Sequence, residues 1–131
     1  MSERSNVGKY GETLVANFLK KQGNIIVRRN YNSRYGEIDI VAENEEYILF
    51  VEVKTRKSGS IISPADAVSH AKQKRIVLTA KEFISKLRVG ANYRFDVAEV
   101  FYHIDENGQF KASLNYIKNA FTDEVIEDIP F

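Results

Sequence analysis

Two short runs of strand-forming residues carry charges where a buried β-sheet normally carries apolar side chains, and this feature most constrains the fold. The runs occupy residues 36–40 and 50–54, and the polar residues 44–47 between them are typical of a tight turn. The pattern predicts an antiparallel hairpin. A two-residue loop at Glu45 and Glu46 makes the numbers of facing residues sum to 91.

This register determines which charged side chains meet. It places Asp39 opposite Glu52. It likewise places Glu37 opposite Lys54, with facing Cβ atoms about 4.5–5.5 Å apart. Because side chains alternate along a strand, all four share one face. The residues expected on the other face are Ile38, Ile40, Val51 and Val53. Burying three carboxylates and one ammonium is costly, so the pattern indicates a bound divalent cation.

The composition limits which cation this is. The chain has no cysteine and only two histidines, so a thiolate site is excluded and a histidine-rich zinc site is disfavoured. Oxygen ligands favour Mg²⁺, Mn²⁺ or Ca²⁺. We expect Mg²⁺ or Mn²⁺, held by Asp39 and Glu52, with the backbone carbonyl of Val53 beside them and Glu12 completing the site from the first helix.

Hydrophobic periodicity and turn signals predict the remaining elements within one domain, residues 1–131. A helix over 3–22 is expected to end at Gly23. The other predictions are a strand over 25–31, the hairpin over 36–56, a helix from an N-cap at Ser63 to Val89, strands over 93–104 and 110–121, and a loosely held acidic tail over about 122–131. A helix at each end of a strand run predicts an α/β fold with helices on both faces of the sheet.

The charge distribution suits a polyanionic substrate, although charge alone favours a solvated surface. Residues 1–90 carry a net charge of +6, whereas residues 91–131 carry −5. Basic side chains that could contact phosphates are Arg28, Arg29, Arg34, Arg56, Lys57, Lys72, Lys74 and Arg75. The simpler alternative is a solvated basic surface with no partner. No run approaches a membrane span and residues 1–10 lack an apolar signal region, so we expect a cytoplasmic location.

These residues suit the hydrolysis of a phosphodiester. Carboxylates that hold one or two Mg²⁺ ions can neutralise the transition state and activate water. Lys54 would orient the water or meet charge on the phosphate. Glu37 would hold the Lys54 ammonium or act as a further ligand, and Gln73 would reach the site from the second helix. The structural alternative is that Asp39 and Glu52 are strand carboxylates paired with Lys54.

The same residues resemble a known family. Asp39 followed by Glu52-Val53-Lys54 is similar to the signature of the PD-(D/E)xK, or restriction-endonuclease-like, nucleases, although Ile38 replaces the proline. A closer resemblance, to the bacterial YraN family, is carried by Gly8-x-x-Gly11-Glu12, Arg29-Asn30, Gly36-Glu37-Ile38-Asp39, Phe50 to Arg56 and Arg94-Phe95-Asp96-Val97. That family is similar to archaeal Holliday-junction resolvases.

The resemblance implies an αβββαβ core with a mixed central sheet and a metal site at Glu12, Asp39, Glu52 and Lys54. It also implies homodimerisation and action on double-stranded or branched DNA. Two alternatives remain, a nucleic-acid-binding module without turnover and a protein-interaction module. We interpret Asp96 as structural, bonded to a backbone amide or to Arg94.

Overall fold

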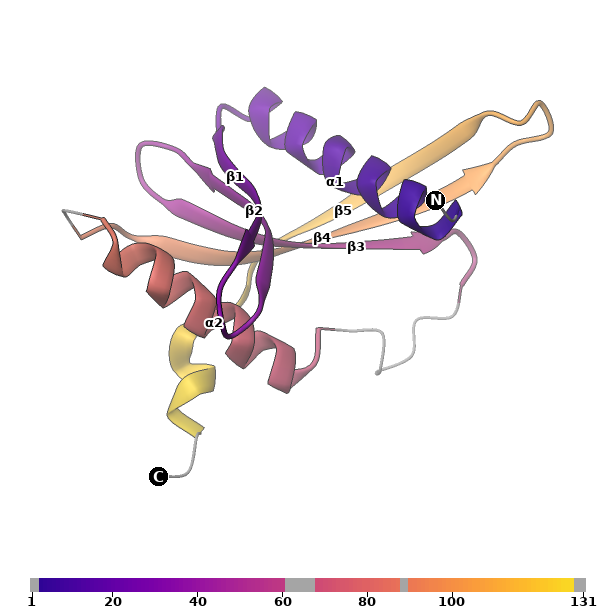
Figure 1. Ribbon diagram of the computed structural model, residues 1–131. Helices are drawn as coiled ribbons and strands as arrows, with labels where there is room; N and C mark the ends of the chain where they lie inside the picture. Colours follow the sequence, from indigo (N-terminus) through magenta and orange to yellow (C-terminus); the bar gives the residue numbers. More distant parts are fainter. Residues whose placement is uncertain (1–2, 61–67, 88–89, 129–131) are drawn as a thin grey trace.

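The computed structural model describes residues 3–60, 68–87 and 90–128, which form a five-stranded sheet with a helix on each face (Figure 1). The elements are α1 (Glu3–Lys21), β1 (Ile25–Asn32), β2 (Glu37–Glu43), β3 (Ile48–Lys57), α2 (His70–Ser85), β4 (Tyr93–Ile104), β5 (Phe110–Phe121) and the 3₁₀ helix η2 (Asp123–Asp128). The strands lie in the order β1-β2-β3-β4-β5, and only β3 and β4 are parallel. The mixed sheet and the αβββαβ core are confirmed.

The predicted hairpin register is confirmed where β2 and β3 pair. Ile40 faces Val51 and Glu43 faces Ile48. Asn44 stabilises the turn, because its Oδ1 accepts from the Glu46 and Tyr47 amides at 2.8 Å each.

The register prediction is wrong beyond that point. The β2–β3 ladder ends at the pair of Ile40 and Val51. From there β2 stays paired only with β1, where Glu37 faces Asn32. Glu37 is therefore not opposite Lys54.

Two hydrophobic clusters form the core, one on each face of the sheet. Val15, Leu19 and Ile40 belong to the cluster under α1. Phe50 and Val77 belong to the cluster under α2. Each face of the sheet is thus covered, which explains why β3 is apolar on both faces over its first half.

The prediction that Ile38 and Ile40 share one face of the sheet is wrong. Ile38 belongs to the α2 cluster, whereas Ile40 belongs to the α1 cluster. The β1–β2 ladder shifts register between Ile26 and Arg28. Such a bulge increases the local twist of a strand pair. Once β2 has left β3, the twisted pair turns toward α2 and takes Ile38 and Tyr31 with it.

Helix α1 ends at a glycine and packs closely on β3 at another. Gly23 has a φ of 93°, and the Asn24 amide donates to the Leu19 carbonyl at 3.0 Å, closing the last turn as predicted. Gly11 is buried, and a Cβ there would lie 3.2 Å from Thr55 Cβ and would overlap Thr55 Oγ1. A glycine at position 11 therefore sets the distance between α1 and the sheet.

We expect Gly11→Ala to destabilise the fold by about 1–3 kcal/mol, because the added methyl forces α1 away from β3. Gly8→Ala is the matched control, since a Cβ at position 8 would have no neighbouring atom within 4 Å. That change should be neutral or stabilising by up to about 1 kcal/mol through helix propensity. Urea denaturation of both variants measures this, and equal stabilities would contradict the close packing.

Helix α2 begins later than predicted. Its N-cap is Ser69, whose side chain accepts from the Lys72 amide at 3.1 Å, and the helix starts at His70. The predicted N-cap, Ser63, lies outside the described residues, as does Val89. The helix ends at Ser85 with Lys86 as its C-cap.

The sequence predicts a loosely held acidic tail, but the described part of this segment packs against α2. Val125 and Ile126 contact the α2 cluster. Tyr93 donates its hydroxyl to Asp123 at 2.6 Å. This bond, followed by burial, raises the pKa of Tyr93 to about 12. The apolar residues of the segment explain the difference from the prediction, which weighs only its charge.

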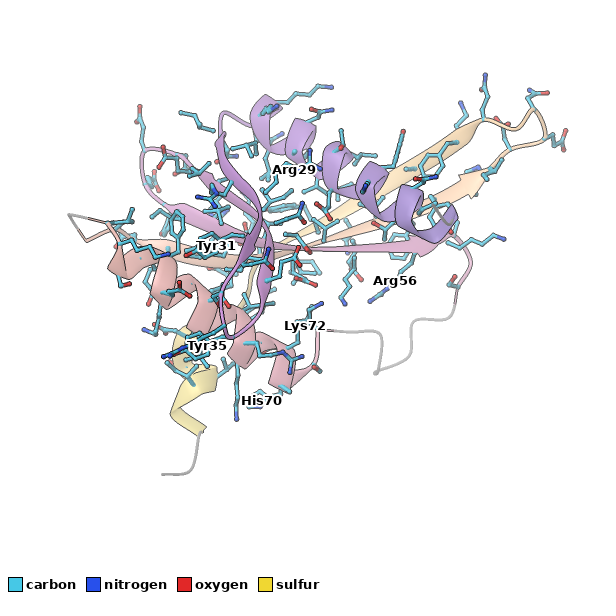
Figure 2. All side chains as sticks on the ribbon, viewed as in Figure 1. Arg29, Tyr31, Tyr35, Arg56, His70 and Lys72 are labelled. Atoms are coloured by element: carbon cyan, nitrogen blue, oxygen red, sulfur yellow. The ribbon has the colours of Figure 1, made fainter. Side chains whose placement is uncertain are left out.

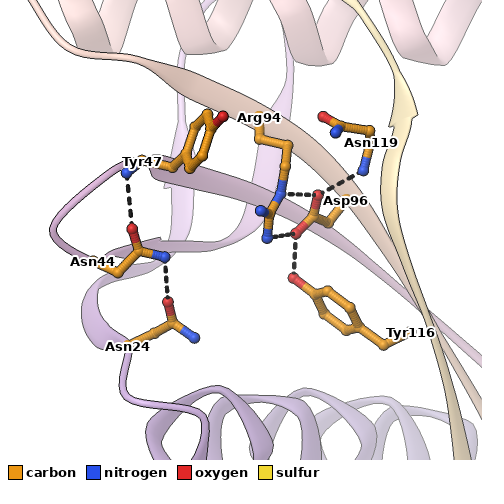
Figure 3. A network of polar contacts seen from close by, with 7 residues as sticks. All are labelled: Asn24, Asn44, Tyr47, Arg94, Asp96, Tyr116 and Asn119. Atoms are coloured by element: carbon orange, nitrogen blue, oxygen red, sulfur yellow. Dashed lines mark hydrogen bonds and ion pairs between the residues drawn. The ribbon is translucent and has the colours of Figure 1, made fainter.

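Asp96 is the centre of a buried polar network, as the structural interpretation predicts (Figure 3). Its side chain is fully buried and accepts from Arg94 Nε at 2.9 Å and Nη2 at 3.0 Å. It also accepts from the Tyr116 hydroxyl at 2.6 Å and the Asn119 amide at 3.0 Å. The network ties β4 to β5 where their register shifts.

Removing the Asp96 carboxylate should be among the most damaging changes in the chain. We expect Asp96→Ala to cost about 3–5 kcal/mol, because Arg94 loses its partner in a partly buried position and Tyr116 loses its acceptor. Thermal or chemical denaturation measures the loss. The control is Glu106→Ala, at an exposed position of the β4–β5 turn, for which a much smaller cost is expected. Similar costs for the two variants would contradict this assignment.

Candidate functional site

The candidate site lies where β2 and β3 separate, just beyond the pair of Ile40 and Val51, and we call this place the fork. Asp39 is the first β2 residue past the last ladder pair, and its Oδ2 accepts from the Val53 amide at 2.8 Å. A side-chain oxygen therefore replaces the backbone carbonyl that a continuous ladder would present to β3. This contact fixes the Asp39 carboxylate between the two strands.

Three carboxylates converge at this fork. Burial raises the pKa of Asp39 to about 7, and the charges of Glu52 and Glu12 add to the rise. The hydrogen bond from Val53 opposes it. Glu52 itself is only 4% exposed on β3. The charges of Glu52 and Glu12 thus act on Asp39, although Asp39 and Glu52 are not joined by ladder hydrogen bonds.

Glu12 reaches the fork from α1 and meets a second group of residues. Its Oε1 lies 3.7 Å from Arg29 Nη2. Burial raises the pKa of Glu12, the charge of Arg29 opposes the rise, and the Glu37 carboxylate reinforces it. In the amide orientation that satisfies both carboxylates, Asn30 Nδ2 lies 3.2 Å from Glu12 Oε1 and 2.8 Å from Glu37 Oε1. Glu37 therefore lies with Glu12 rather than with Lys54.

Two lysines contact Glu52. Lys54 Nζ lies 3.8 Å from Glu52 Oε1, whereas Lys72 Nζ, from α2, lies 2.6 Å from the same oxygen. Burial and the Lys72 charge lower the pKa of Lys54. Burial also acts to lower the pKa of Lys72, but its hydrogen bond and charge interaction with Glu52 outweigh this and raise it.

Lys72 is the site residue that sequence reasoning missed, since the sequence predicts only a phosphate contact for it. It lies in the first turn of α2, and Figure 2 labels it between that helix and the sheet. It lies four residues before the buried Ile76, on the same side of the helix, and this spacing is the signal that could have placed it near the sheet.

Gln73 does not join the carboxylates. Its Nε2 donates to the Val68 carbonyl at 3.0 Å, which holds the side chain at the start of α2. It lines a cavity of about 250 Å³ together with Lys54. Residues that line the rest of that cavity include Arg56, Val97, Glu99 and Phe121. Gln73 and Lys54 thus line the same cavity, but Gln73 does not contact the carboxylates.

The donor set is suited to a hard divalent cation. Asp39, Glu52 and Glu12 offer only carboxylate oxygens, and a cation beside Asp39 would oppose the effects of burial and of the Glu52 charge, which raise its pKa. Within the described residues, however, no three acidic or histidine side chains are already arranged as a metal-binding group. The closest cation to Glu52 is the Lys72 ammonium.

Three of the eight basic residues expected to contact phosphates form ion pairs with acidic side chains of the chain. Arg29 pairs with Glu12, Lys72 with Glu52, and Arg56 Nη1 lies 3.3 Å from Glu99 Oε2. Figure 2 labels the three basic residues. Of the other five, Arg28, Arg34, Lys57 and Arg75 are exposed and Lys74 is half-buried. No ion pair of these five with a described residue competes with a phosphate contact.

The raised pKa of Asp39 predicts a distinctive pH dependence of stability. Between about pH 4 and pH 7 the folded state keeps a proton that the unfolded state releases, so Asp39 lowers stability as the pH rises through this window. Asp39→Asn removes this effect. We expect the free energy of unfolding of the variant, relative to that of the natural protein, to rise by on the order of 2–4 kcal/mol between pH 4 and pH 8. Chemical denaturation in EDTA at several pH values measures it, and a pH-independent difference would contradict it.

The fold and the fork together define a class of protein. A mixed sheet in an αβββαβ order, with two carboxylates and a lysine where its second and third strands separate, is the restriction-endonuclease-like architecture. The profile of the Uncharacterised protein family UPF0102 matches residues 11–100. The chain therefore belongs to UPF0102, the YraN family.

Clostridial proteins are similar over most of the chain. A UPF0102 protein of Clostridium perfringens is 45% identical over 117 residues, which cover 88% of this chain and 93% of that protein. One from Clostridium acetobutylicum is 44% identical over 115 residues, covering 87% and 92%. One from Clostridium botulinum is 39% identical over 118 residues, covering 88% and 94%.

In the part of the chain that the structure describes, neither long helix combines the length and the apolar character needed to cross a bilayer.

Proposed function

We propose that this chain is a metal-dependent endonuclease that hydrolyses phosphodiester bonds in double-stranded or branched DNA. The observation that carries the proposal is the fork, where Asp39, Glu52 and Glu12 converge and Lys54 lies 3.8 Å from Glu52. A structural ion pair needs one carboxylate and one cation. At this site Glu52 and Glu12 have cationic partners, whereas Asp39 forms no ion pair with a described residue and accepts only the Val53 amide, which leaves a buried carboxylate without a counter-charge.

Each residue of the fork has a role in this proposal. Asp39 and Glu52 would hold Mg²⁺ or Mn²⁺, with Glu12 and the Val53 carbonyl as further oxygen donors. The bound cation would supply charge to neutralise the phosphate and would make a water more acidic. The Val53 amide fixes the orientation of Asp39. Lys54, with its lowered pKa, would orient the water or meet charge on the phosphate.

Exposed or half-buried basic residues on the elements beside the fork suit a nucleic-acid backbone. Arg28 lies on β1 and Lys57 at the end of β3, while Lys74 and Arg75 lie on α2. Phosphate contacts of this kind position a duplex without reading its sequence. We further propose that the protein acts as a homodimer on branched DNA, as the resemblance to junction resolvases implies.

A second candidate function is DNA binding without cleavage. The observation that favours it is the short contact between Lys72 and Glu52. The Lys72 ammonium already neutralises the carboxylate to which a metal ion would bind. A binding module would keep the basic surface and would not need the cation.

A cleavage assay separates the two functions. Linear, nicked and four-way-junction DNA are incubated with the purified protein and Mg²⁺, Mn²⁺ or EDTA. We expect metal-dependent products whose rate of formation falls about 10²–10³-fold in Lys54→Ala, because a charged group at the reacting phosphate is lost. Asp39→Ala should be at least as impaired. Binding of the junction by Lys54→Ala should be retained, measured by fluorescence anisotropy.

Lys111→Ala is the matched control, because this exposed lysine lies on β5 away from the fork. It should keep the activity of the natural protein. Binding without products under every metal would favour the second function. Products that persist in both Asp39→Ala and Lys54→Ala would assign the cleavage to a contaminant and overturn the nuclease proposal.

A further inference from the structure

We propose that Lys72 is a resident counter-ion of Glu52 that a divalent cation must displace, so that the first turn of α2 controls the metal affinity of the fork. This inference rests on the proposed function in one respect, that the fork binds metal. It adds a residue outside the carboxylate and lysine motif, and it assigns that residue to the control of metal binding rather than to phosphate contact.

The contact geometry is the first argument. Lys72 Nζ lies 2.6 Å from Glu52 Oε1, the distance of a strong charge-assisted hydrogen bond. Lys54 Nζ lies 3.8 Å from the same atom and is the weaker partner. A cation that binds this oxygen needs the lone pair that the Lys72 ammonium now uses. The Lys72 ammonium and a metal ion therefore cannot both bind this oxygen at full strength.

Burial of Glu52 is the second argument. Its side chain is 4% exposed, so water cannot replace a lost partner cheaply. The carboxylate therefore needs a cation whether or not metal is present. Lys72 supplies that charge in the metal-free protein, and the paired state is the competitor that an incoming cation meets.

The attachment of Lys72 makes displacement feasible without unfolding. Its backbone amide is fixed, because it donates to the N-cap Ser69 at 3.1 Å. Its side chain is 35% exposed and has a flexible four-carbon stem. The ammonium can therefore turn outward while α2 stays in place. Lys54 emerges from a strand inside the sheet, so it is less suited to such movement.

Population arithmetic gives the size of the effect. If the Lys72 contact is formed about 90–99% of the time, the apparent metal affinity is reduced about 10- to 100-fold from its intrinsic value. Removing the ammonium should recover that factor. It should also lower the stability of the metal-free protein, because Glu52 keeps only its longer contact with Lys54. Tighter metal binding combined with a less stable metal-free state is the signature of a displaced counter-ion.

The test compares Lys72→Met with the natural protein in Mn²⁺ titrations without DNA, followed by calorimetry and by the electron paramagnetic resonance of free Mn²⁺. We expect Mn²⁺ to bind Lys72→Met at least about 10-fold more tightly. Lys72→Gln should behave alike, which keeps the test usable if the methionine variant does not fold. Lys72→Arg, which keeps the charge, should remain close to the natural protein.

Lys74→Met is the matched control, because it removes a charge two residues away on the same helix, and Lys74 makes no ion pair with a described residue. An equal gain in Lys72→Met and Lys74→Met would mean a general field effect and would overturn the inference. Unchanged or weaker binding by Lys72→Met, or no binding by any variant, would also overturn it. None of these outcomes depends on DNA cleavage, so the cleavage assay tests the nuclease proposal independently.

Discussion

The separation of β2 from β3 is the constraint on which the rest of the site depends. A continuous ladder would use the Val53 amide for a backbone bond and would leave no space between the strands. Asp39 takes that amide with its side chain instead. The opening lets Glu12 approach from the α1 side, while Glu52 and its lysines lie toward α2. Residues on opposite faces of a sheet can meet only at such a gap.

The sequence predicts the paired part of the hairpin well and its unpaired part poorly. Alternation and turn chemistry determine the facing of Ile40 with Val51, because both faces of β3 are buried and a register slip would expose apolar residues. The same rule fails for Glu37 and Ile38, since it assumes that the ladder continues. The bulge in β1 and the end of the β2–β3 ladder at Ile40 are properties of the folded sheet, and no local pattern announces them.

The predictions for α2 fail at its start for a related reason. The prediction places the N-cap at Ser63, because a proline follows it at the first helical position. The helix starts after Ser69, which points Lys72 toward Glu52 and leaves Gln73 bonded to Val68. Asp96 is interpreted correctly because Arg94 lies two residues away on the same strand face. Its third partner, Tyr116, lies 20 residues further along the chain and could not be found without the fold.

The two buried aspartates show how structure distinguishes a structural carboxylate from a candidate functional one. Asp96 receives donors from Arg94, Tyr116 and the Asn119 amide, so its charge is compensated where it lies. Asp39 receives one backbone donor and faces the charge of Glu52, and its pKa rises to about 7. A fold that can satisfy one buried carboxylate so fully has no physical reason to leave another under-compensated. Strongly perturbed groups of this kind gather at functional sites.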